Sequence, residues 1–322
     1  MKSPVLLLGA GLLALSVSAC SAGTTGAAGG TTDSAGSSDE RALHVAAAFY
    51  PLQLALEQIG GGRVGVTSLT QAGAEPHDVE LTPRQVGELA GADLVVYLQG
   101  FQPAVDDAVT AAGAPALDIS PAADLTLTAA DHGHDHAGSA GDDDEHAGAA
   151  TDPHFWLDPT RYASVAEAIS ERLIELDPDG RDGYVQNTAE FTGDLRALDG
   201  EFGTALRSCI HRDLVTGHAA FGYLADRYDL HQVGIAGLTP DHEPTAGQVR
   251  DLVEHVRESG VSTVYAQTLA SPALTETVAR EAGVEVRGLD PIEGVTEASA
   301  GSDYFEIMRA NLQTLREGQG CS

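Results

Sequence analysis

The chain has 322 residues and carries 48 Asp and Glu against 17 Lys and Arg, a formal net charge of −31 at pH 7. A surface this acidic repels nucleic acid and anionic lipid and attracts cations, so we expect no nucleic-acid partner. The length suffices for two modest α/β domains or one large one. Beyond the N-terminus no stretch is long and apolar enough to cross a membrane.

The N-terminal segment is typical of an export signal. A positive start is followed by an apolar run too short to span a bilayer, and small residues then precede Cys20. These residues resemble a bacterial lipobox, which implies a signal peptide at 1–19 and lipid on Cys20; an ordinary signal peptide with an incidental cysteine is the alternative. Residues 20–40 are poor in apolar groups and predict a flexible tether. We therefore expect an extracytoplasmic lipoprotein, anchored to the outer face of the cell membrane.

Strand and helix patterns alternate through residues 41–180. Strands are predicted at 43–49, 63–69, 93–99 and 115–119, and helices at 51–59, 82–92, 102–112 and 159–176. The helix at 82 opens with Thr82, Pro83 and Gln85, a capping box with proline at the first helical position. Residues 131–148 interrupt the order as a loop that holds four histidines among six carboxylates. The alternation indicates parallel βαβ units.

One long helix is predicted at 181–208, because its apolar residues recur on a single helical face. The alternation then restarts through 209–322. Strands are predicted at 213–217, 230–235, 261–267 and 284–289, and helices at 219–228, 245–259, 271–282 and 302–317. The fold class is therefore α/β: two parallel-sheet lobes, 41–180 and 209–322, joined by one long rigid helix.

Four potential metal ligands follow strands or precede a helix in the two predicted lobes. They are His77, His154, His218 and Asp290. Because ligands of open α/β sheets bind beyond the carboxyl ends of the strands, all four can face one cleft between the lobes. Three imidazoles and a carboxylate make a tetrahedral shell for a divalent transition metal. The alternatives are surface histidines in loops and a turn-capping role for Asp290.

Five motifs carry a family resemblance. "GAEPHDVELTP", "DPHFWLDP", "VTGHAAFGYLADRYDL", "GLTPDHEPTAGQV" and "GLDPIEG" together resemble the periplasmic metal-binding proteins of zinc and manganese ABC importers, from about residue 43 to Cys321. The resemblance implies two α/β lobes joined by a rigid helix, with the metal between them. It places the ligands at His77, His154, His218 and Asp290. It also implies a function as a receptor that delivers its ion to a membrane permease.

The third ligand position bears on the choice of metal. Manganese members of the family typically carry glutamate where this chain has His218, and a third imidazole favours zinc over manganese. A variant of the family uses a glutamate directly before the first histidine, but Pro76 occupies that position here. We therefore expect Zn²⁺ as the transported ligand, an ABC permease as partner, and a monomer. A manganese receptor is the alternative.

Two further groups of residues complete the interpretation. If Cys20 is lipidated, Cys209 and Cys321 remain, and an even pair in an exported protein suggests a disulfide. The alternative is that both thiols are free. The resemblance also implies the disulfide, because such a pair is common among the relatives. In the loop 131–148 we expect weak auxiliary metal capture or zinc sensing, rather than the main site, because each ligand must be ordered on binding; a solvated loop is the alternative. Its histidines are His132, His134, His136 and His146.

The sequence also favours a binding protein over an enzyme. A secreted zinc hydrolase needs an open metal position for water and a general base, and the chain has neither an HExxH nor a GxSxG motif. An adhesin function is compatible with transport, but no particular residue favours it.

Overall fold

The computed structural model describes residues 42–129, 150–240 and 244–322. The predictions for the signal peptide 1–19, Cys20 and the tether 20–40, and for His132, His134, His136 and His146, lie outside the described residues. Residues Arg41–Ser322 belong to a single compact unit. Within the described ranges no helix combines the length and the apolar character that a membrane span needs.

The first sheet has four parallel strands in the order β2-β1-β3-β4. The strands are β1 (Leu43–Ala47), β2 (Val64–Ser68), β3 (Leu94–Tyr97) and β4 (Ala116–Asp118), and the helices are α1 (Tyr50–Gly60), α2 (Pro83–Leu89) and α3 (Pro103–Ala112). Thr82 caps α2 through the predicted capping box with Gln85. A short helix, α4 (Ser120–Ala123), was not predicted, because four residues are too few to show a period.

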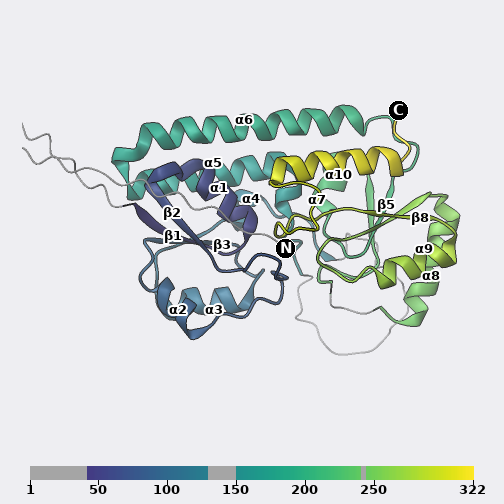
Figure 1. The fold of residues 1–322 in the computed structure, drawn as a ribbon, viewed down its shortest axis with the longest axis horizontal. Coiled ribbons are helices and arrows are strands. Elements are labelled where there is room, and N and C mark those ends of the chain that lie inside the picture. The colour runs from purple at the N-terminus through teal and green to yellow at the C-terminus, as the bar shows by residue number, and fades with distance from the viewer. Residues whose placement is uncertain (1–41, 130–149, 241–243) are drawn as a thin grey trace, which may run out of the picture. The chain divides into compact units, whose positions relative to one another are not determined.

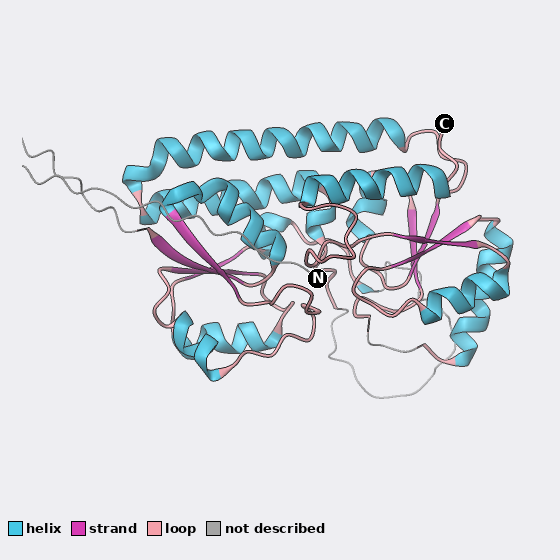
Figure 2. Ribbon diagram, in the orientation of Figure 1, coloured by secondary structure: helices cyan, strands magenta, loops and turns pink. Residues whose placement is uncertain are grey.

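The second sheet repeats this topology with the order β6-β5-β7-β8, again all parallel. Its strands are β5 (Asp213–Thr216), β6 (His231–Gly234), β7 (Thr263–Ala266) and β8 (Glu285–Gly288). Its helices are α7 (Gly222–Arg227), α8 (Ala246–Ser259) and α9 (Ala273–Ala282). Figure 2 shows the strands as two separate sheets, each flanked by helices. The predicted fold class is therefore confirmed.

Three long helices pack beside the two sheets: α5 (Pro159–Leu176), α6 (Arg181–Ala205) and α10 (Tyr304–Gly318). Two of them, α5 and α6, lie between the sheets in the chain. The predicted connecting helix is α6, which buries one face along its length and packs against α5, α1 and α10 (Figure 1). It ends at Ala205, slightly before the predicted residue 208. The helix thus contacts helices of both halves, as a rigid connection requires.

Two links fix the ends of α6. Before it, the Arg63 guanidinium donates from Nε and Nη2 to the Asp177 carboxylate at 2.7 and 2.9 Å, and the Tyr184 hydroxyl donates to the same carboxylate at 2.7 Å. The hydrogen bond from Arg63 is the main reason that the pKa of Asp177 falls to about 2. After the helix, the predicted disulfide joins Cys209 and Cys321, 112 residues apart. The C-terminus is therefore bound covalently to the segment that follows α6.

Candidate metal centre

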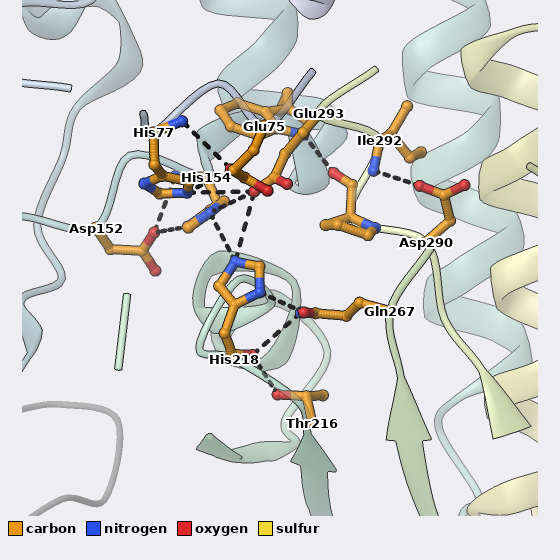
Figure 3. A network of polar contacts seen from close by, with 12 residues as sticks. Glu75, His77, Asp152, His154, Thr216, His218, Gln267, Asp290, Ile292 and Glu293 are labelled. Atoms are coloured by element: carbon orange, nitrogen blue, oxygen red, sulfur yellow. Dashed lines mark hydrogen bonds and ion pairs between the residues drawn. The ribbon is translucent and has the colours of Figure 1, made fainter. Parts of the chain in front are cut away.

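Four side chains from distant parts of the chain converge on one point. The ligand atoms of His77, His154, His218 and Glu293 all lie within 4.8 Å of one another. The Oε1 atom of Glu293 lies 3.3, 3.1 and 3.5 Å from the Nε2 atoms of the three histidines, taken in chain order (Figure 3). At most 5% of any of these side chains is exposed.

The loop after β2 carries His77. The buried Gln102 side chain donates from Nε2 to the Pro76 carbonyl at 2.9 Å and to Thr70 Oγ1 at 3.0 Å, which fixes the backbone next to the histidine. The imidazole packs edge-on against Phe101, with ring centroids 4.8 Å apart. Burial lowers the pKa of His77, which favours the neutral imidazole that a metal needs.

His154 is held just before α5, whose N-terminus is capped by the Asp158 side chain. Its Nδ1 contacts Asp152 Oδ1 at 2.7 Å, so Nε2 is turned toward Glu293. Burial by itself lowers the pKa of His154, but the two neighbouring carboxylates outweigh it and raise the pKa to about 9. With this pKa the imidazole is protonated at neutral pH, and a divalent cation would compete with the proton for Nε2.

The third histidine lies directly beyond β5. The Nδ1 atom of His218 forms a short hydrogen bond with Gln267 Oε1, and the Thr216 hydroxyl donates to the His218 carbonyl at 2.6 Å. An acceptor at Nδ1 fixes the orientation of the ring and directs Nε2 into the centre, where it is the nitrogen available to a metal. Asp152 does the same for His154, so two of the three imidazoles are oriented for metal binding by residues behind them.

The loop that carries Glu293 is locked onto the loop that carries His154. The indole Nε1 of Trp156 donates to the Pro291 carbonyl at 2.8 Å, and the Tyr304 hydroxyl donates to the Trp156 carbonyl at 2.6 Å. Both aromatic side chains are fully buried. Their hydrogen bonds hold a segment that precedes α6 against one that follows it, and so fix the distance between ligands from the two halves.

The structure places the predicted carboxylate ligand, Asp290, outside this group and brings Glu293 into it. The Asp290 Oδ1 atom accepts a hydrogen bond from the Ile292 backbone amide at 2.8 Å, so this carboxylate is directed away from the histidines (Figure 3). Ile292 adopts a φ of 56°, a conformation that is rare for a branched side chain and costs about 1–3 kcal/mol. This turn between the two acidic residues directs Glu293 inward, and the pattern of residues at the end of the strand does not show it.

Glu293 is chemically suited to its position. Burial opposes ionisation of its carboxyl group, but hydrogen bonds from the three histidines hold its pKa well below the usual range, so it stays an anion. The N···O separations of 3.1 to 3.5 Å also match the edge of a metal tetrahedron, about 3.3 Å for ligands near 2.05 Å from zinc. The group therefore fits a four-coordinate ion with three nitrogen ligands and one oxygen ligand.

Known proteins with similar sequences include zinc-binding and zinc-uptake proteins. The chain is 35% identical over 288 residues to "Zinc-binding protein AdcA" of Streptococcus pyogenes serotype M3. The alignment covers 86% of this chain but only 56% of that protein. It is 32% identical over 281 residues to "High-affinity zinc uptake system protein ZnuA" of Bacillus subtilis, with 85% of this chain and 87% of that one covered. The chain thus spans about half the length of the streptococcal relative.

Solved structures show the same fold. The Zn(II)-bound ZnuA-like domain of Streptococcus pneumoniae AdcA superposes with a TM-score of 0.70 at 31% identity, covering 86% of this chain and 99% of that domain. A sequence model of the family described as "Zinc-uptake complex component A periplasmic" matches residues 45–318. The family inferred above from the five motifs is thereby confirmed in its zinc branch: the chain belongs to the family of periplasmic A components of zinc-uptake complexes.

Proposed function

We propose that this protein is an extracytoplasmic receptor that binds Zn²⁺ and delivers it to an ABC permease. The observation that carries the proposal is the buried convergence of His77, His154, His218 and Glu293. The names of the relatives, which include zinc-binding and zinc-uptake proteins, support the same ion. We assign these four residues as the zinc ligands, with Glu293 in place of Asp290.

The donor set favours zinc over manganese. Three imidazole nitrogens suit zinc, whereas manganese prefers oxygen donors, and the group formed by the described residues supplies a single carboxylate. The shell also has four protein ligands, as structural zinc sites have, and leaves no position for the water that a zinc hydrolase activates. A closed shell of this kind supports binding and release rather than catalysis.

Anchoring and capture extend the same proposal. Lipid on Cys20 would hold the receptor at the outer face of the membrane, close to its permease, and a relative is named "Zinc-binding lipoprotein AdcA". We retain the division into an N-terminal lobe at 41–180, a linker helix and a C-terminal lobe at 209–322. The histidines of 131–148 would capture zinc weakly for the buried site.

A zinc titration tests the proposal. Metal-stripped protein lacking residues 1–20 is titrated with Zn²⁺ against a competing chelator, with Mn²⁺ as rival ion. We expect one tight zinc site that survives deletion of 131–148 and is lost in His154→Ala. Tight binding that disappears with the loop and survives His154→Ala would refute the assignment of the site. Equal competition by manganese would refute the choice of metal.

A further inference from the structure

The metal ligands are almost inaccessible to solvent, which raises the question of how an ion reaches them. The four side chains are 0 to 5% exposed. Among the cavities that the described residues line, two lie next to the proposed metal ligands. One, of about 380 Å³, is lined by Gln267, which contacts His218, and by Glu75; the other, of about 210 Å³, is lined by His77.

The larger cavity has one charged lining residue among those that the structure describes. Its walls come mainly from the loops after β5, β6 and β7, through Gly217, Ala236, Gln267 and their neighbours. Glu75 enters from the other half of the chain, on the loop after β2. The described walls of the smaller cavity include no carboxylate. A hydrated cation is therefore attracted to the larger cavity, because a carboxylate in a low-dielectric recess raises the local cation concentration.

Glu75 also touches the metal centre. Its Oε1 atom lies 4.0 Å from His77 Nε2 and accepts a hydrogen bond from the His77 backbone amide at 3.3 Å. The side chain is 22% exposed, whereas His77 is 5% exposed. Figure 3 shows Glu75 beside the His77 ring, and yet Glu75 does not belong to the group whose ligand atoms lie within 4.8 Å of one another. It is thus within reach of one ligand and of the cavity, but not of the whole shell.

We propose that Glu75 is a transfer carboxylate, which binds incoming Zn²⁺ from the cavity and passes it to His77 and then to the buried shell. An ion held between Glu75 Oε1 and His77 Nε2 exchanges the Glu75 oxygen for the nitrogens of His154 and His218 and the oxygen of Glu293. No redox change or bond cleavage is involved, only the replacement of water and one carboxylate oxygen by the final ligands. The proposal rests on the proposed function, since it concerns the path of the same ion.

A transfer group and a permanent ligand have different kinetic signatures. A group that contacts the ion only on the path stabilises the barrier and not the bound state, so its loss slows association and dissociation by the same factor and leaves Kd unchanged. A permanent ligand stabilises the bound state, so its loss raises Kd mainly through faster dissociation.

Stopped-flow fluorescence of the single tryptophan can follow both rates with Zn²⁺ alone as the probe. Trp156 lies against the His154 ring, at a centroid distance of 5.3 Å, so its emission reports occupancy of the centre. Association is measured with Zn²⁺ in excess and dissociation with an excess of chelator. The variant is Glu75→Gln, and the matched control is Glu80→Gln, which removes the same charge from an exposed position on the same loop.

We expect Glu75→Gln to slow association and dissociation by the same factor, with Kd unchanged, because the carboxylate lowers one barrier that the ion crosses in both directions. The factor should be roughly tenfold, the lower end of the acceleration that charged clefts give to association. The control variant Glu80→Gln should change either rate only by the small amount expected from one fewer negative charge on the protein surface. Rates in Glu75→Gln equal to those of the control would overturn the proposal, as would faster dissociation with a raised Kd, which marks a permanent ligand. A wild-type protein that binds no zinc would overturn the proposed function as well.

Discussion

The two acidic residues of the loop after β8 provide the sharpest test of the proposed zinc site. Asp290 and Glu293 are both buried and lie three positions apart. Glu293→Gln and Asp290→Asn each remove one negative charge and keep the size of the side chain. Only Glu293 lies within 3.5 Å of all three histidine nitrogens. We expect a large loss of zinc affinity in Glu293→Gln and a change of at most a few-fold in Asp290→Asn.

Coulomb's law sets the scale of the loss. A carboxylate oxygen about 2.1 Å from a divalent ion contributes about 4 kcal/mol even at the dielectric constant of water, or roughly a thousandfold in Kd. Because Glu293 is 1% exposed, screening is weaker than in water, which strengthens the attraction between the carboxylate and the ion. The amide oxygen of the new glutamine can still bind the ion, which offsets part of the loss of affinity.

Competition of each variant against a zinc chelator of known affinity measures this difference at a fixed pH. Circular dichroism of the metal-free proteins controls for folding, since Asp290 Oδ1 accepts the Ile292 amide and an asparagine oxygen can do the same. A thousandfold loss in Asp290→Asn together with near-normal binding in Glu293→Gln would show that the loop rearranges and that Asp290 is the ligand after all.

Three further predictions concern the groups around the site and the ends of α6. Asp152→Asn, which weakens the hydrogen bond to His154 Nδ1, should lower zinc affinity about 10- to 100-fold in the same competition assay, the usual cost of losing such a support. Replacing both Cys209 and Cys321 by serine should lower the free energy of unfolding by about 4–5 kcal/mol in the chain-entropy model, as measured by denaturant titration of the metal-free protein. Because the pKa of Asp177 falls from 3.8 to about 2 on folding, its contribution to stability is complete above the unfolded value and lost as the pH drops toward 2. Asp177→Asn should therefore flatten the acid side of the stability profile.

Hydrophobic alternation was sufficient to predict both sheets. Positions after a strand or before a helix, together with the family resemblance, pointed to the three histidines, whose assignment as metal ligands stays a prediction. The carboxyl end of a parallel strand has a defined edge, so His218, one residue beyond "DLVTG", had to lie there. The capping box at Thr82 was predictable for a similar reason, because its hydrogen bonds involve only residues three apart. These features depend on short-range geometry, which the sequence shows directly.

The carboxylate ligand depended on geometry that no local pattern shows. Asp290 and Glu293 lie in the same short motif, and the left-handed turn at Ile292 decides which of them faces the histidines. Residues behind the ligands, such as Asp152 and Gln267, were missed for the same reason: their role follows from side-chain direction after packing. Glu293 could have been found as the second carboxylate of "DPIEG", had both been weighed against the three histidines.

The disulfide has a topological consequence. Because Cys321 is joined to Cys209, residues 209–321 form a closed covalent ring that contains His218 and Glu293, while His77 and His154 lie on the open part of the chain. A single backbone cut within the ring leaves both fragments attached through sulfur, whereas a cut before Cys209 severs the chain outright. Proteolytic damage to the second half is therefore retained in one molecule, and an oxidising compartment keeps two of the four proposed zinc ligands attached to the chain even after a nick.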